Sequence, residues 1–87
     1  MNVITARKKP VVITAIQWNN NEPEIREFVP DDALLRFSGK TGLRVYNTTE
    51  QDWIDVNHLH YIIKGTKGEF YPCSPEVFEQ VYDLVED

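Results

Sequence analysis

The alternation of apolar and polar residues in the C-terminal third predicts a strand, a turn, a second strand and a helix. Residues 61–63 form an aromatic and β-branched run, which is typical of a strand packed on at least one face. The glycines at both ends of residues 65–68 allow the chain to reverse, and residues 69–71 resume the extended pattern. Pro72 then ends that strand or lies at a sheet edge, because proline has no N–H to donate to a neighbouring strand.

A helix is expected to follow this hairpin. Ser74 is a favourable N-cap, Pro75 suits the first helical position, and Glu76 faces the positive end of the helix dipole. The residues that recur at helical spacing and predict its apolar face are Val77, Phe78, Val81, Tyr82, Leu84 and Val85. We expect Phe78 and Tyr82 to close the core, and Val77, Val81 and Leu84 to offer a surface for contact with another subunit.

The N-terminal half begins with a run that is apolar at nearly every position. Residues 11–18 predict a strand with apolar side chains on both faces, which indicates a central strand covered on each side. A short helix follows, with Ile25, Phe28 and Val29 on its buried face, and Pro30 ends it.

The middle of the chain predicts a β-hairpin. Residues 34–37 and 43–46 alternate apolar and polar side chains around a glycine-containing turn, and residues 52–56 form a further strand. The whole chain, residues 1–87, is expected to form one domain with a flexible lead at residues 1–8. We predict an α+β fold: a small curled, mostly antiparallel sheet of five or six strands, with one short helix after the first strand and one at the C-terminus.

The charge distribution limits the classes of partner. The net charge of −5 argues against binding to duplex nucleic acid, which needs a basic surface. Bases and acids are unevenly spread, because residues 33–47 hold three bases and no acid whereas residues 74–87 hold five acids and no base. A local positive site for a small anion is therefore compatible with the composition. No apolar run is long enough for a membrane span, and the single cysteine favours a reducing cytoplasm.

Several short motifs suggest chemistry, and none is supported by its context. Gly39-Lys40-Thr41 resembles the end of a phosphate-binding loop but lacks its first glycine and the helix that should follow. His58 and His60 have the spacing of a metal pair without a second cluster of ligands. Cys73 precedes a helix N-terminus, yet the sequence shows no base beside it. We therefore predict no catalytic residue, no metal ligand and no cofactor.

Aromatic and basic residues are interleaved along the chain, a combination that suits a compact nucleotide. Aromatic rings stack on bases, an amide can read a base edge, and lysines beside a glycine turn can meet a phosphate. The predicted ligand-binding residues are Gln17, Trp18, Arg36, Lys64, Lys67 and Tyr71.

The two ends of the chain resemble a widespread family of small tailed-phage proteins. The pattern at the C-terminal end consists of Gly65, Gly68-Glu69, Tyr71-Pro72-Cys73, Pro75, Phe78 and Tyr82. At the N-terminal end residues 9–18 are similar to the family's opening, whereas His58-Leu59-His60 stands where members carry a proline-glycine-aspartate type of turn.

The resemblance implies a function that composition and spacing do not reach. Some members of the family act as sponges that bind the cyclic nucleotide signals of bacterial anti-phage defence. It therefore implies a non-catalytic anti-defence protein of the anti-CBASS or anti-Thoeris type, in the cytoplasm of the infected host. Its ligand would be a cyclic dinucleotide or a cyclic ADP-ribose type of nucleotide, held by a homo-oligomer, possibly a tetramer. The alternative is a small phage protein that binds and inhibits a host protein.

Overall fold

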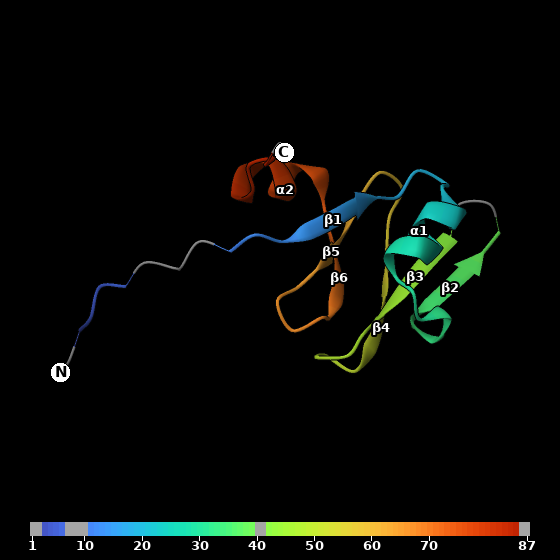
Figure 1. The fold of residues 1–87 in the computed structure, drawn as a ribbon, viewed down its shortest axis with the longest axis horizontal. Helices are drawn as coiled ribbons and strands as arrows, with labels where there is room; N and C mark the ends of the chain where they lie inside the picture. The colour runs from blue at the N-terminus through green and yellow to red at the C-terminus, as the bar shows by residue number, and fades with distance from the viewer. Residues whose placement is uncertain (1–2, 7–10, 40–41, 86–87) are drawn as a thin grey trace.

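The protein is an α+β fold of two helices and six antiparallel strands, seen in a computed structural model that describes residues 3–6, 11–39 and 42–85. The strands form two three-stranded sheets, which we call the first sheet (order β1-β5-β6) and the second sheet (order β2-β3-β4). In chain order the elements are β1 Thr14–Gln17, α1 Glu22–Phe28, a 3-10 turn Asp32–Leu34, β2 Leu35–Ser38, β3 Gly42–Asn47, β4 Asp52–Asp55, β5 Tyr61–Lys64, β6 Phe70–Cys73 and α2 Pro75–Val81. The predicted fold class is thus confirmed, with the strands divided between two sheets (Figure 1).

The core lies between the inner faces of the two sheets and α1. Its buried side chains are Trp18, Ile25, Val29, Leu35, Leu43, Val45, Val56, Ile62 and Phe70. Ile25 and Val29 are fully buried and Phe28 is half-buried, so the predicted buried face of α1 is confirmed. Figure 1 shows α1 beside β2 and β3, whereas α2 lies at the first sheet.

The prediction that the first strand is central is wrong. β1 begins at Thr14 and pairs only with β5, so within the described residues it is an edge of the first sheet. Ile16 packs on the core, whereas Ile13 and Ala15 line a groove on the opposite face. Apolar residues on both faces therefore reflect two different environments, and they do not require a second neighbouring strand.

The two predicted hairpins are confirmed. In the β2–β3 pair, Leu35 lies opposite Val45 and Phe37 opposite Leu43, as the alternation requires. The β5–β6 turn closes through a hydrogen bond from the Gly65 N–H to the Glu69 carbonyl, 2.8 Å long. Pro72 lies in β6, the other edge of the first sheet, where its missing N–H leaves no ladder bond unmade.

Only part of the predicted apolar stripe at the C-terminus is buried. Ser74 caps α2 as expected, since its hydroxyl accepts a hydrogen bond from the Val77 N–H. Phe78 is the buried residue of this helix. Tyr82 is half-buried, and the other stripe residues are exposed by 48% (Val77), 61% (Val81), 82% (Leu84) and 73% (Val85). Phe78 therefore faces the core as predicted, and the predicted contact of Val77, Val81 and Leu84 with another subunit stays a prediction.

The predicted flexible lead is described only over residues 3–6. These residues form no regular element, and Val3 and Ile4 are more than four-fifths exposed. Among the helices of the described residues, none has the length and hydropathy needed to cross a bilayer.

Asn47 connects the two sheets. It ends β3 and is 4% exposed. Its side-chain N–H donates to the Phe70 carbonyl of β6 at 2.9 Å, while its carbonyl oxygen accepts from the Glu50 N–H at 2.7 Å. This one side chain therefore satisfies a backbone group on β6 and another in the turn after β3.

We expect Asn47→Ala to lower the free energy of unfolding by about 1–3 kcal/mol, because two backbone groups lose their hydrogen-bond partner. Urea denaturation followed by circular dichroism measures the change. The matched control is Asn57→Ala, an exposed position whose replacement should change stability by less than about 0.5 kcal/mol. Equal stability of the two variants would contradict the bridging role.

Candidate functional site

The candidate site is an open groove on the outer face of the first sheet. The strand register places Ala15, Ile63 and Tyr71 side by side on this face, opposite the face that carries the core. α2 covers one end, where the Phe78 ring stacks on Tyr61 with centroids 4.1 Å apart and an interplanar angle of 12°. The remaining groove has a volume of about 820 Å³.

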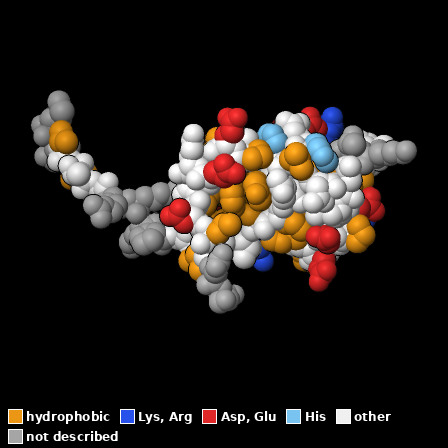
Figure 2. Space-filling view, turned by 90° about the horizontal axis from the view of Figure 1, so that it is seen from above, with side chains coloured by type: hydrophobic (Ala, Val, Ile, Leu, Met, Phe, Trp, Pro, Cys, Tyr) orange, Lys and Arg blue, Asp and Glu red, His pale blue; other side chains and the backbone are white. Residues whose placement is uncertain are grey.

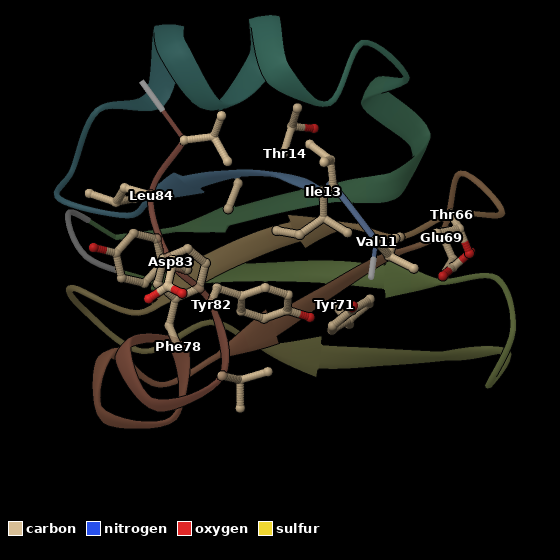
Figure 3. A pocket seen from close by; sticks show the side chains of 16 residues that line it. Val11, Ile13, Thr14, Thr66, Glu69, Tyr71, Phe78, Tyr82, Asp83 and Leu84 are labelled. Atoms are coloured by element: carbon tan, nitrogen blue, oxygen red, sulfur yellow. The ribbon is translucent and has the colours of Figure 1, made fainter. Parts of the chain in front are cut away.

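Two segments from opposite ends of the chain form the walls. One wall is the extended chain of residues 11–15, and the other is the segment 81–85 that follows α2. Tyr61, Tyr71 and Phe78 contribute to the same groove between them. Figure 3 shows Thr66 and Glu69 at one end of the groove, and Phe78 and Leu84 at the other.

The walls are apolar and accessible. Val12, Val81, Leu84 and Val85 are each more than 60% exposed, and Val11 is 46% exposed. In Figure 2, seen from the side on which α2 lies, hydrophobic side chains gather into a patch with acidic side chains at its border. Contiguous apolar surface of this kind is typical of an interaction site, whereas single exposed apolar residues are not.

The charged residues that line the groove are acidic. They are Glu69 and Asp83, and no described lysine or arginine lines it. One carboxylate oxygen of Glu69, Oε2, is shielded from solvent and receives no hydrogen bond from the described residues. The carboxylate lies over Gly65, where a Cβ would collide with it, so the glycine makes its position accessible.

Tyr71 lies on the floor of the groove in a partly desolvated environment. Burial, and then a hydrogen bond with the Tyr82 hydroxyl, raises the pKa of Tyr71 from 10.0 to about 12, and the neighbouring Glu69 carboxylate acts in the same direction. These effects all disfavour the phenolate, so Tyr71 presents a neutral ring and hydroxyl to the groove.

The raised pKa of Tyr71 predicts a loss of stability in alkali. Below pH 10 the phenol is protonated in both the folded and the unfolded chain, so its contribution is constant. Between pH 10 and about 12 the unfolded chain releases this proton first, and the free energy of unfolding should fall as pH rises. Urea titrations across this range should show a shallower decline of the free energy of unfolding for Tyr71→Phe than for the wild type. Both proteins are also measured at pH 7 as the reference. An identical slope in both proteins would contradict the shift.

The sequence prediction for Trp18 is corrected by its burial. Trp18 is 2% exposed and belongs to the core, so its ring offers no stacking surface to a ligand. Its neighbour Gln17 donates its side-chain N–H to the Leu59 carbonyl at 2.9 Å. Trp18 follows the last residue of β1 and shares the inner face with Ile16, which is why it turns into the core.

The other predicted ligand-binding residues are only partly brought together. Arg36 lies on the second sheet, with its guanidinium 4.2 Å from the centre of the Trp53 ring. Lys64 is exposed and lines neither hollow of the first sheet. Lys67 and Tyr71 do share a smaller hollow of about 340 Å³ beside the groove, together with Glu69.

The sequence reasoning did not single out Glu69, Tyr82 or Phe78 as site residues. The signal for Glu69 was present, because Gly65, Glu69 and Tyr71 lie on one face of the β5–β6 hairpin. The position of Tyr82 across from this face depends on how α2 docks, which the local pattern does not specify.

The histidine pair and Cys73 lie in the part of the chain that the structure describes. His58 is exposed and His60 half-buried, and the described residues contain no group of three potential metal ligands. Burial raises the pKa of the Cys73 thiol, which disfavours the thiolate that a nucleophile requires. Lys40 and Thr41 of the loop-like motif lie outside the described residues.

The comparisons with known proteins give no assignment. No family model, no curated protein and no solved structure matches this chain. The resemblance to small phage proteins therefore stays a prediction.

Proposed function

We propose that this chain is a non-catalytic binding protein that docks a partner protein on the open apolar face of the first sheet. The observation that supports this most directly is the groove between residues 11–15 and 81–85, whose aliphatic walls are exposed while α2 covers only one end. Large aromatic residues surrounded by aliphatic ones are typical of the central part of a protein interface.

The lining chemistry favours a protein over a phosphorylated ligand. A dianionic nucleotide requires bases near its phosphates, and the charged residues that line the groove are Glu69 and Asp83. The resemblance to phage proteins implies that the partner is a bacterial host protein. It also implies that the chain acts in the cytoplasm of the infected cell.

Site-specific crosslinking tests this proposal. A benzophenone amino acid at Val81, which is 61% exposed in the groove wall, should crosslink the partner in bacterial cells. The same group at Leu59 is the control, because Leu59 is 45% exposed and does not line the groove. Val81→Ser combined with Leu84→Ser should abolish binding of the captured partner, whereas Leu59→Ser should retain it. Equal crosslinking from both positions would contradict the proposal.

A second function, sequestration of a cyclic nucleotide signal, is favoured by the contact of Lys67 and Tyr71 with one hollow. A lysine and an aromatic ring are suited to a phosphate and a base, although Glu50 and Glu69 line the same hollow. Isothermal titration with cyclic dinucleotides and cyclic ADP-ribose isomers tests it. Lys67→Ala should weaken binding by about 1–2 kcal/mol and reduce its salt dependence, and the absence of heat with every nucleotide would remove this candidate.

Self-association would use the same surfaces. The exposed side chains of α2 and the edge strands β1 and β6 are available to a second copy, and a homo-oligomer, possibly a tetramer, stays a prediction. Light scattering at micromolar concentration measures it, since the chain alone has a mass of 10.2 kDa. A mass near that of one chain would leave the face free for a different partner.

A further inference from the structure

The side chain of Glu69 packs against the turn that joins β5 and β6. Glu69 follows the Gly65–Gly68 turn, and its side chain folds back over Gly65 onto the outer face of the first sheet. This arrangement is accessible only because residue 65 has no Cβ, which would occupy the space of the carboxylate. The carboxylate is therefore directed toward the groove and away from the solvent beside the turn.

One oxygen of the Glu69 carboxylate lacks a hydrogen-bond donor among the described residues. Its Oε2 atom is shielded from solvent without a hydrogen bond from the described residues. The ion pairs found among the described residues join Arg26 to Glu22 and Asp32, and Arg44 to Asp55, so none of them neutralises Glu69. A buried carboxylate oxygen without a donor is costly, and a cationic donor that binds the outer oxygen, Oε1, would offset part of that cost by neutralising the carboxylate charge.

The surroundings of Glu69 also favour a cation. Tyr71 lies beside it and Tyr82 lies beside Tyr71 in the groove, and the faces of aromatic rings attract cations. Asp83 adds a second negative charge to the lining. Lys67 lines the adjacent hollow, which Glu69 also lines, but not the groove, and the ion pairs of the described residues do not include one between Lys67 and Glu69.

We propose that Glu69, with Tyr71 and Tyr82, forms a subsite for the guanidinium or ammonium group of an otherwise apolar segment of the partner. The aliphatic walls would hold the apolar residues of the segment, and the carboxylate would accept hydrogen bonds from its one cationic side chain. This inference rests on the proposed function, since it specifies the chemistry of the partner docked on that face.

The test uses four acetylated and amidated peptides, each with two valines on either side of a central arginine, lysine, citrulline or glutamate. Citrulline has the shape of arginine without its charge, so the pair isolates the cationic group. Binding to the full chain is measured by changes in amide chemical shifts, which also report whether residues 11–15 and 81–85 respond. We expect the arginine and lysine peptides to bind about tenfold or more tightly than the citrulline peptide, because hydrogen bonds to a charged group are lost in the latter.

Two variants and a matched control assign the preference to Glu69. Glu69→Gln keeps the shape of the side chain and should reduce the affinity for the arginine peptide to that for the citrulline peptide. Gly65→Ala should have a similar effect by displacing the carboxylate, with little further loss when the two changes are combined. Glu76→Gln is the control, since it removes the same charge from an exposed position of α2 outside the groove, and it should bind as the wild type does.

The outcomes separate this inference from the proposed function. Equal binding of the arginine and citrulline peptides in the groove would overturn the cationic subsite and leave docking on this face intact. A preference for arginine that persists in Glu69→Gln would also overturn it. If no peptide binds, the inference fails, and the crosslinking from Val81 independently decides whether the face docks a protein.

A purely structural role of Glu69 predicts a different result. If the carboxylate served the fold, Glu69→Gln would lower the free energy of unfolding. Because the carboxylate has a shielded oxygen without a donor, we expect Glu69→Gln to be at least as stable as the wild type in urea while losing its preference for arginine.

Discussion

Trp18→Ala should lower the free energy of unfolding by about 3–5 kcal/mol, because it removes a buried tryptophan side chain from the core. The ring is 2% exposed and its centroid lies 5.9 Å from that of Phe37. The backbone of Trp18 donates to the His60 carbonyl and accepts from the Leu59 N–H, and alanine keeps both bonds. The loss is therefore one of side-chain packing, and it is a large fraction of the ~5–15 kcal/mol typical of a whole domain.

Urea denaturation monitored by circular dichroism measures this loss. The control is Trp53→Ala, since Trp53 is half-buried on the outer face of the second sheet, where it contacts Tyr46 and Arg36. Its replacement should cost less than half as much. A Trp18→Ala protein as stable as the wild type would instead support the sequence-based prediction that Trp18 is an exposed ligand-stacking residue.

Phe78→Ala should release α2 from the first sheet, at a cost of roughly 3 kcal/mol. Phe78 is 7% exposed and stacks on Tyr61, and its ring centroid lies 5.2 Å from that of Tyr82. It is the buried residue of a helix of seven residues, and so short a helix is not stable alone in water. Without this anchor α2 should lose its structure and the end of the groove that it covers should open.

Hydrogen exchange measures this effect locally. The amides of α2 should lose their protection in Phe78→Ala, while those of β3 in the second sheet keep theirs. Val77→Ala is the matched control on the same helix, because Val77 is 48% exposed and alanine favours helix formation. Loss of protection in both variants, or in neither, would show that Phe78 is not the anchor. Tyr82→Ala should have a smaller effect than Phe78→Ala, since Tyr82 is only half-buried.

The amino-acid sequence by itself determined the elements of this fold. The alternation in residues 35–46 specifies the β2–β3 hairpin and its register, because a shift of one residue would expose Leu35 and Val45. Ser74 and Pro75 fix the start of α2, and the glycine turn fixes the β5–β6 reversal. These are local signals, since each depends on residues that are close together in the chain.

Tertiary structure alone decided the division into two sheets, the edge position of β1 and the candidate site. An apolar residue in a sequence pattern indicates that its side chain is buried. It does not indicate which element covers that side chain. The pattern of residues 11–18 is therefore the same for a central strand and for an edge strand with one face in the core and the other in a groove. In the same way, Trp18 is buried and Tyr82 reaches the groove through contacts between residues distant in the sequence, and such contacts leave no local pattern.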